Sequence, residues 1–119
     1  YNLLLKYTPE APTIVSGNYY DMPSTFYLHQ NFPNPFNNST SIIFEVPKHI
    51  NNNLITATQN IKITVYDIAG RIVETIVNSN YLPGVYKTQW NASAYSSGVY
   101  FYKLTAGGFS ETKRMVLLK

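Results

Sequence analysis

Hydrophobic and polar residues alternate along most of the chain from Tyr27 onwards, in short runs that fit the two-residue period of a β-strand. The clearest run is NIKITVY, residues 60–66, in which every second residue is a branched aliphatic one: Ile61, Ile63 and Val65. This pattern predicts a strand with one buried face and one face nearer to water.

Several more runs of this kind follow one another, separated by residues that favour turns. Pro83-Gly84, Ser97-Gly98 and Gly107-Gly108 each stand directly before a new run. The predicted strands lie at residues 41–46, 60–66, 71–77, 85–90, 99–106 and 109–119. The spacing indicates about seven strands in all. The predicted fold class is therefore all-β, an immunoglobulin-like or fibronectin III-like antiparallel β-sandwich.

The stretch DIAG, residues 67–70, joins two of these runs. Asp67 stands where a type I turn uses a side-chain acceptor, and Gly70 stands where the chain needs a positive φ before it enters the next strand. Arg71 opens the returning run. The sequence therefore predicts a hairpin at this point.

Aromatic residues make up 15% of the chain, with 11 tyrosines and one tryptophan. We expect Trp90 to fill the space between the two sheets, with ligand stacking as the alternative. Tyr100 and Tyr102 lie on one face of their strand, opposite Val99 and Phe101. Two interpretations stay open: tyrosines packed with their hydroxyls at the rim of the core, or a tyrosine-rich surface that holds sugar or protein.

The length of 119 residues fits one domain, which we place at residues 27–119. Residues 1–26 are rich in Pro, Ser and Thr and are predicted to be a linker or tail from an upstream domain. The sequence opens at a tyrosine rather than a methionine, and we therefore expect it to begin within a longer protein.

Charge and cysteine content exclude several classes of function. Only 13% of the residues are charged, the net charge is +3, and no basic run of the kind that binds nucleic acid is present. With no cysteine, disulfides and thiolate metal sites are excluded. No apolar run approaches the roughly 20 residues of a membrane helix.

Residues suited to catalysis are few and scattered. His29 and His49 have no neighbouring ligand partner, and the six acidic residues are isolated from one another. No nucleophile elbow, P-loop or dinucleotide-binding glycine set is present. We therefore predict a protein that is not an enzyme, with no metal and no cofactor.

The stretch QNFPNPFN, residues 30–37 and here called the clip, fits neither strand nor helix periodicity. Its two prolines fix φ, lack an N–H and push the residues before them towards extended conformations. We predict a stiff, extended and unpaired segment pinned by two aromatic anchors. Its motif residues are Gln30, Asn31, Phe32, Pro33, Asn34, Pro35 and Phe36.

Taken together, residues 28–119 resemble the type A C-terminal sorting domain of type IX secretion cargo, a family related to the immunoglobulin-like domain of the flagellar hook-capping protein. The motifs that carry the resemblance are the clip, VYDIAGR at residues 65–71, SGVYFY at residues 97–102 and the terminal RMVLLK. Two features depart from the family pattern: a long loop at residues 47–60, and Arg114 where lysine is common.

The resemblance implies a domain at the end of a larger secreted protein. Its partners would be an outer-membrane translocon with its shuttle and sortase proteins, and the upstream cargo domain of the same polypeptide. The location would be the cell surface or the medium, reached through the periplasm of a Gram-negative bacterium. The alternative is a carbohydrate-binding or adhesive module that uses Tyr100, Tyr102 or the long loop and takes a polysaccharide as partner.

The terminal strand is the predicted sorting signal. It is expected to form a sheet edge with unpaired backbone groups and a free Lys119. Met115 and Leu117 should hold the core while Val116 and Leu118 stay available, unless both faces are simply buried. The candidate recognition residues are Lys113, Arg114, Met115, Val116, Leu117, Leu118 and Lys119.

Overall fold

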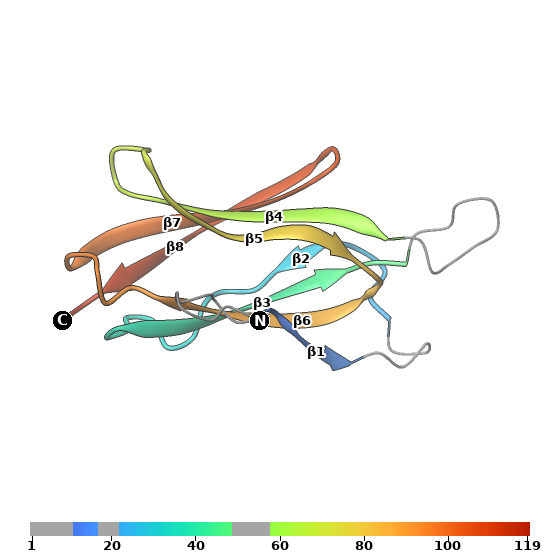
Figure 1. Ribbon diagram of the computed structural model, residues 1–119, viewed down its shortest axis with the longest axis horizontal. Helices are drawn as coiled ribbons and strands as arrows, with labels where there is room; N and C mark the ends of the chain where they lie inside the picture. Colours follow the sequence, from blue (N-terminus) through green and yellow to red (C-terminus); the bar gives the residue numbers. More distant parts are fainter. Residues whose placement is uncertain (1–10, 17–21, 49–57) are drawn as a thin grey trace, which may run out of the picture.

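A computed structural model describes residues 11–16, 22–48 and 58–119, and within these ranges the chain forms eight β-strands in two layers (Figure 1). The strands are β1 (Thr13–Ser16), β2 (Tyr27–Leu28), β3 (Ser39–Val46), β4 (Gln59–Tyr66), β5 (Ile72–Tyr81), β6 (Gly84–Asn91), β7 (Gly98–Ala106) and β8 (Phe109–Leu117).

Each layer is a four-stranded antiparallel sheet. The first sheet has the order β1-β6-β3-β2 and the second has the order β5-β4-β7-β8. The hairpins β4–β5 and β7–β8 stay within the second sheet, and the chain crosses between the layers before β4, after β5 and after β6. The predicted all-β sandwich is confirmed. The strand count is eight rather than about seven because β1 and β2 are too short to show a period.

The core lies between the two sheets and follows the alternation seen in the sequence. In β3 and β6 every second residue is buried, and in β4 the aliphatic residues Ile61, Ile63 and Val65 are fully buried. Trp90 is 1% exposed, which confirms its predicted place in the core. The largest fully buried side chains are those of Trp90, Tyr102, Phe44, Leu28, Ile42, Ile61, Ile63, Leu104, Met115 and Leu117.

The turn between β4 and β5 has the predicted hairpin chemistry. Asp67 Oδ1 accepts the backbone N–H groups of Ala69 and Arg71, at 2.9 and 3.0 Å, and Asp67 Oδ2 accepts Arg71 Nε at 2.8 Å. The hydrogen bond from the Arg71 backbone is the main cause that lowers the pKa of Asp67. Gly70 has φ of 84°, as expected.

Replacing Gly70 by valine is expected to lower the free energy of unfolding by about 1–3 kcal/mol. The cause is backbone strain alone, because a Cβ at this position would meet no atom within 4 Å. Gly108→Val is the matched control, since Gly108 has the same open space without a positive φ. Urea unfolding of both variants tests the prediction, and equal losses would contradict it.

Two further predictions concern the linker at residues 1–26 and the long loop at residues 47–60. Residues 13–16, inside the predicted linker, form β1 and pair with β6 as an edge strand. The division into residues 1–26 and 27–119 remains a prediction. Of the long loop at residues 47–60, residues 49–57 lie outside the described part of the chain.

Candidate functional site

The terminal strand β8 is the edge of the second sheet, and its side chains alternate between the core and the outside. Met115 and Leu117 are fully buried, as predicted. Val116 is half-buried and Leu118 is 56% exposed, so the alternative in which both faces are buried is wrong. Arg114 is also exposed. Three neighbouring outward side chains of the predicted signal are therefore accessible.

The clip lies along the outer edge of β8 and pairs with it. Phe36 donates its N–H to the carbonyl of Val116 at 2.9 Å, and its own carbonyl accepts the Leu118 N–H at 2.8 Å. The side chain of Asn34 accepts the Val116 N–H through Oδ1 at 3.0 Å. The prediction that this part of the edge has unpaired backbone groups is therefore wrong. A segment about 80 residues earlier in the chain satisfies them.

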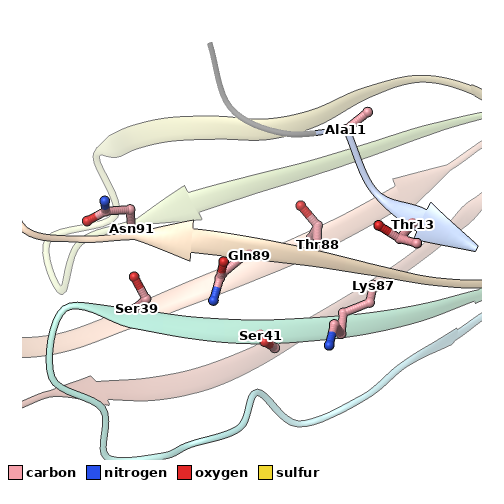
Figure 2. Close-up of a pocket in the computed structure, with 8 residues that line it drawn as sticks. All are labelled: Ala11, Thr13, Ser39, Ser41, Lys87, Thr88, Gln89 and Asn91. Carbon is pink, nitrogen blue, oxygen red and sulfur yellow. The ribbon is translucent and has the colours of Figure 1, made fainter. Parts of the chain in front are cut away.

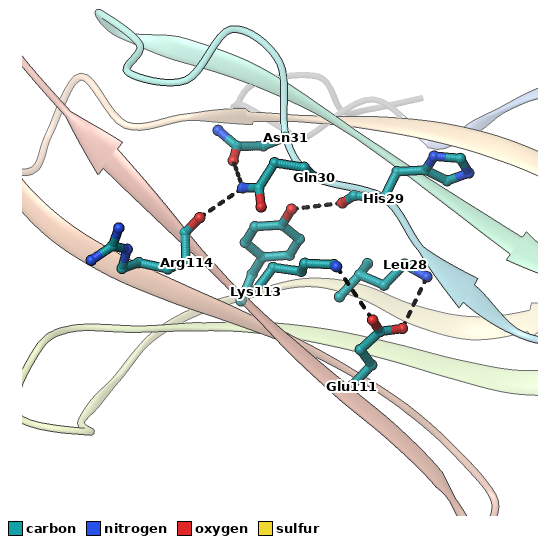
Figure 3. A network of polar contacts seen from close by, with 8 residues as sticks. Leu28, His29, Gln30, Asn31, Glu111, Lys113 and Arg114 are labelled. Atoms are coloured by element: carbon teal, nitrogen blue, oxygen red, sulfur yellow. Dashed lines mark hydrogen bonds and ion pairs between the residues drawn. The ribbon is translucent and has the colours of Figure 1, made fainter.

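Further contacts extend this cover towards the start of β8 (Figure 3). Gln30 donates its side-chain amide to the Arg114 carbonyl at 2.7 Å. Glu111 accepts the Leu28 N–H at 3.4 Å and pairs with Lys113 at 3.4 Å. Leu28 of β2 and the segment that joins β2 to β3 thus follow the chain from Glu111 to Leu118 and cover this edge of the second sheet.

Polar side chains hold the clip in shape from within. Asn31 is 2% exposed and donates its amide to Thr40 Oγ1 at 2.9 Å and to the Pro33 carbonyl at 3.1 Å. Thr40 donates its hydroxyl to the same carbonyl at 2.8 Å. The peptide bonds before Pro33 and Pro35 are cis. The buried amide therefore finds partners, as a buried polar group requires.

Only one of the two predicted aromatic anchors is buried. Phe36 is 2% exposed, with its ring centroid 6.0 Å from that of Trp90, whereas Phe32 is 79% exposed. The backbone of Phe32 pairs with Ser41, which faces away from the core on the first sheet. Cross-strand partners share a face, so the Phe32 side chain points outwards as well. The prediction of an unpaired clip is also wrong at this end.

Tyr100 and Tyr102 belong to the core, so the interpretation as a tyrosine-rich surface is wrong. Tyr102 is fully buried and donates its hydroxyl to the His29 carbonyl at 2.7 Å, and Tyr100 donates to the Ser96 carbonyl at 2.7 Å. Burial raises the pKa of Tyr102 well above its usual range. The other face of β7, with Val99 and Phe101, is the one that reaches the surface.

Lys119 is tied to the loop before β7 instead of being free. Its backbone N–H donates to Ser97 Oγ at 2.9 Å, and its Nζ donates to the Ser93 carbonyl at 2.7 Å. The residues after β8 are therefore held against the sandwich.

A shallow groove of about 340 Å³ lies on the outer face of the first sheet (Figure 2). Its lining is polar and contains no aromatic side chain, so it offers no stacking platform for a sugar ring. The lining residues are Ala11, Thr13, Ser39, Ser41, Lys87, Thr88, Gln89 and Asn91.

Titratable groups do not gather into a metal site in the described residues, where no cluster of three His, Cys, Asp or Glu side chains is found. His29 pairs with Glu45, and His49 lies outside the described part. The part of the chain that the structure describes contains no helix of the length and apolarity needed to cross a membrane.

These features define a β-sandwich module that presents a terminal strand whose edge is covered by its own chain. Residues 30–118 match the family model of the secretion system C-terminal sorting domain. The chain belongs to this family of type IX secretion sorting domains. A search of the curated proteins gave no match.

Family membership has three direct consequences. A sorting domain of this kind implies export of the protein that carries it, to the cell surface or the medium. It also implies interaction with the secretion machinery. Domains of this family are in general not catalytic.

Proposed function

We propose that this domain directs a larger secreted protein through the type IX translocon of a Gram-negative bacterium, and that the machinery reads the outward side chains of the folded terminal strand. The partners are the outer-membrane translocon and its shuttle and sortase proteins, and the cargo is the upstream part of the same polypeptide. The domain itself does no chemistry.

One observation carries this proposal. The backbone edge of β8 from Val116 to Leu118 is already paired with the clip, while Leu118 remains 56% exposed beside it. A partner therefore meets side chains here, in the order Arg114, Val116, Leu118. A recognition mode by simple strand addition would need the clip to leave first.

The contacts of the clip support a role for it in presenting the signal. It fixes the position of β8 from outside through Asn34 and Phe36, as the core does from inside through Met115 and Leu117. Because the backbone of the strand is held on both sides, less backbone freedom is lost when a partner binds its outward side chains, which lowers the entropy cost of recognition.

Leu118→Asp is expected to reduce export by about tenfold or more, because an apolar side chain buried at an interface contributes about 1.5–3 kcal/mol. The whole chain, residues 1–119, is fused behind a signal peptide and a reporter in a bacterium that has this secretion route. Surface reporter is then measured against total reporter. Substitution is sharper than removal of residues 115–119, since the removal would also take Met115 and Leu117 out of the core.

Leu82→Asp is the matched control, because Leu82 is similarly exposed, at 49%, but lies between β5 and β6. Equal melting temperatures of the two purified variants establish that both fold. Full surface yield for Leu118→Asp would show that the outward face of the terminal strand is not the signal.

A further inference from the structure

The outer face of the second sheet carries a continuous row of large side chains across all four strands. Ile72 pairs with Tyr66, Tyr66 pairs with Phe101, and Phe101 pairs with Arg114. Cross-strand partners share a face. On β4, Val65 and Ile63 point into the core, so Tyr66 next to them points outwards. The row therefore lies on the outside of the sandwich.

Neighbouring pairs widen this row into a surface, here called the outer patch. Towards the end of β8, Val99 and Val116 form the next pair that faces outwards. On the other side of the row, Lys103 pairs with Thr64, and Lys62 lies two residues further along β4 on the same face. The outer patch is the row of four together with Val99, Val116, Lys103 and Lys62.

The outer patch is open to solvent in the described structure. Ile72 is 67% exposed, and Lys62 and Arg114 are exposed, while Tyr66 and Phe101 are half-buried, as side chains in the middle of a sheet face are. Figure 1 shows no described segment on the outer side of β5-β4-β7-β8. The apolar and aromatic side chains of the outer patch are therefore not covered by any described segment of the chain.

The charge of the outer patch has one sign. Its three charged residues, Lys62, Lys103 and Arg114, are all cations. The acidic residues on the same strands point elsewhere, because Glu74 accepts the Trp90 indole N–H and Glu111 accepts the Leu28 N–H. Partners with carboxylates are therefore favoured here.

The outer face of the first sheet is different and provides an internal comparison. There Ile43 pairs with Lys87, and Glu45 lies two residues further along β3 and pairs with His29. Around these, the face carries the small polar residues of the groove. Tyr27 and Phe32 are exposed on the first sheet too, but the charged residues beside them, Lys87 and Glu45, have opposite signs. The two outer faces therefore differ in charge, because only the outer patch combines aromatic side chains with charges that are all positive.

We propose that the outer patch is a docking surface for an acidic protein surface of the export machinery, an inference that rests on the proposed function. Carboxylates of the partner pair with Lys62, Lys103 and Arg114, and an apolar side chain of the partner packs over Tyr66 and Phe101. Tyr66 and Phe101 lie on the two central strands of the sheet, and Arg114 lies beside them on the edge strand. Aromatic residues and arginine are enriched in protein interfaces, and their rims are polar. Arg114 and Val116 belong both to the outer patch and to the outward side chains of the terminal strand. The two surfaces are therefore continuous.

The test uses the ¹⁵N-labelled chain and, as probe, a synthetic peptide in which glutamate alternates with leucine and phenylalanine. We expect amide shifts confined to the outer patch, with binding weakened by salt. Lys103→Glu and Phe101→Ser should each weaken binding about tenfold. The matched controls Lys87→Glu and Ile43→Ser, on the first sheet, should leave it unchanged. Shifts spread over both faces, or equal losses in variants and controls, would overturn the proposal.

Two further arms identify the kind of partner and separate this proposal from the function it rests on. Vesicles with anionic lipid should not bind, and binding of vesicles without binding of the peptide would replace the protein partner by a membrane. In the export assay, Lys103→Glu and Phe101→Ser should lower surface reporter. Normal export of both, with Leu118→Asp still defective, would overturn the outer patch and leave the proposed function intact.

Discussion

Replacing Trp90 by alanine is expected to lower the free energy of unfolding by about 3–5 kcal/mol, as large aromatic truncations in cores do. The indole is 1% exposed, and its ring centroid lies within 6.0 Å of those of Phe36, Tyr95 and Tyr100. Its Nε1 also donates to Glu74 at 3.1 Å. The loss is a large share of the roughly 5–15 kcal/mol that stabilise a typical domain.

Trp90→Phe separates the two contributions. It keeps an aromatic ring in the cavity and removes the indole donor, while Glu74 keeps the hydroxyl of Tyr95 as a partner at 3.2 Å. We expect a smaller loss than for alanine. Urea unfolding followed by circular dichroism measures both variants, and an unfolding midpoint unchanged by Trp90→Ala would refute the place of this residue in the core.

Replacing Phe36 by alanine is expected to cost about 3–5 kcal/mol, whereas Phe32→Ala should change stability by less than about 0.5 kcal/mol. Both are phenylalanines of the clip, but Phe36 is 2% exposed and Phe32 is 79% exposed. Phe36 is also the residue whose backbone pairs with β8. The two substitutions therefore compare a buried with an exposed phenylalanine at nearly the same place in the chain.

The two clip variants also test how the clip holds the terminal strand. If Phe36→Ala loosens the clip, amide hydrogen exchange at Val116 and Leu118 should accelerate before the sandwich unfolds globally, because their N–H groups bond to Asn34 and Phe36. Exchange in Phe32→Ala should stay as in the parent chain. Equal stability losses in the two variants would mean that the buried ring of Phe36 does not anchor the clip.

The covered edge of β8 bears on the stability of this domain and on its proposed function. An open edge strand is a risk for aggregation, and native proteins cover such edges or interrupt them. Here the cover comes from the segment between β2 and β3, so the clip protects β8 and positions its outward residues at once. In the proposed function, these contacts leave the side chains of the strand, rather than its backbone, for a partner to bind.

The local features of this protein could be predicted from its sequence. The alternation of Ile61, Ile63 and Val65 fixed which face of β4 is buried, and Asp67 with Gly70 fixed the hairpin that follows. These features depend on a two-residue period and on the conformational freedom of single residues, which are readable from neighbouring positions. The family resemblance could also be recognised from four motifs that follow one another along the chain. The match of residues 30–118 to the family model confirmed it.

The contacts of the clip and the residues that remain exposed depend on how distant segments pack, and could not be predicted from the sequence. The motif residues of the clip were evident in the sequence, but their pairing with Val116 and Leu118 joins segments about 80 residues apart. The same is true of Phe32, turned outwards by its pairing with Ser41, and of Tyr100 and Tyr102, whose face became the inner one. The two-residue period of hydrophobic and polar residues shows that the two faces of a strand differ. Which aromatic face is buried depends on the sheet packed against it, and that is set by the whole chain.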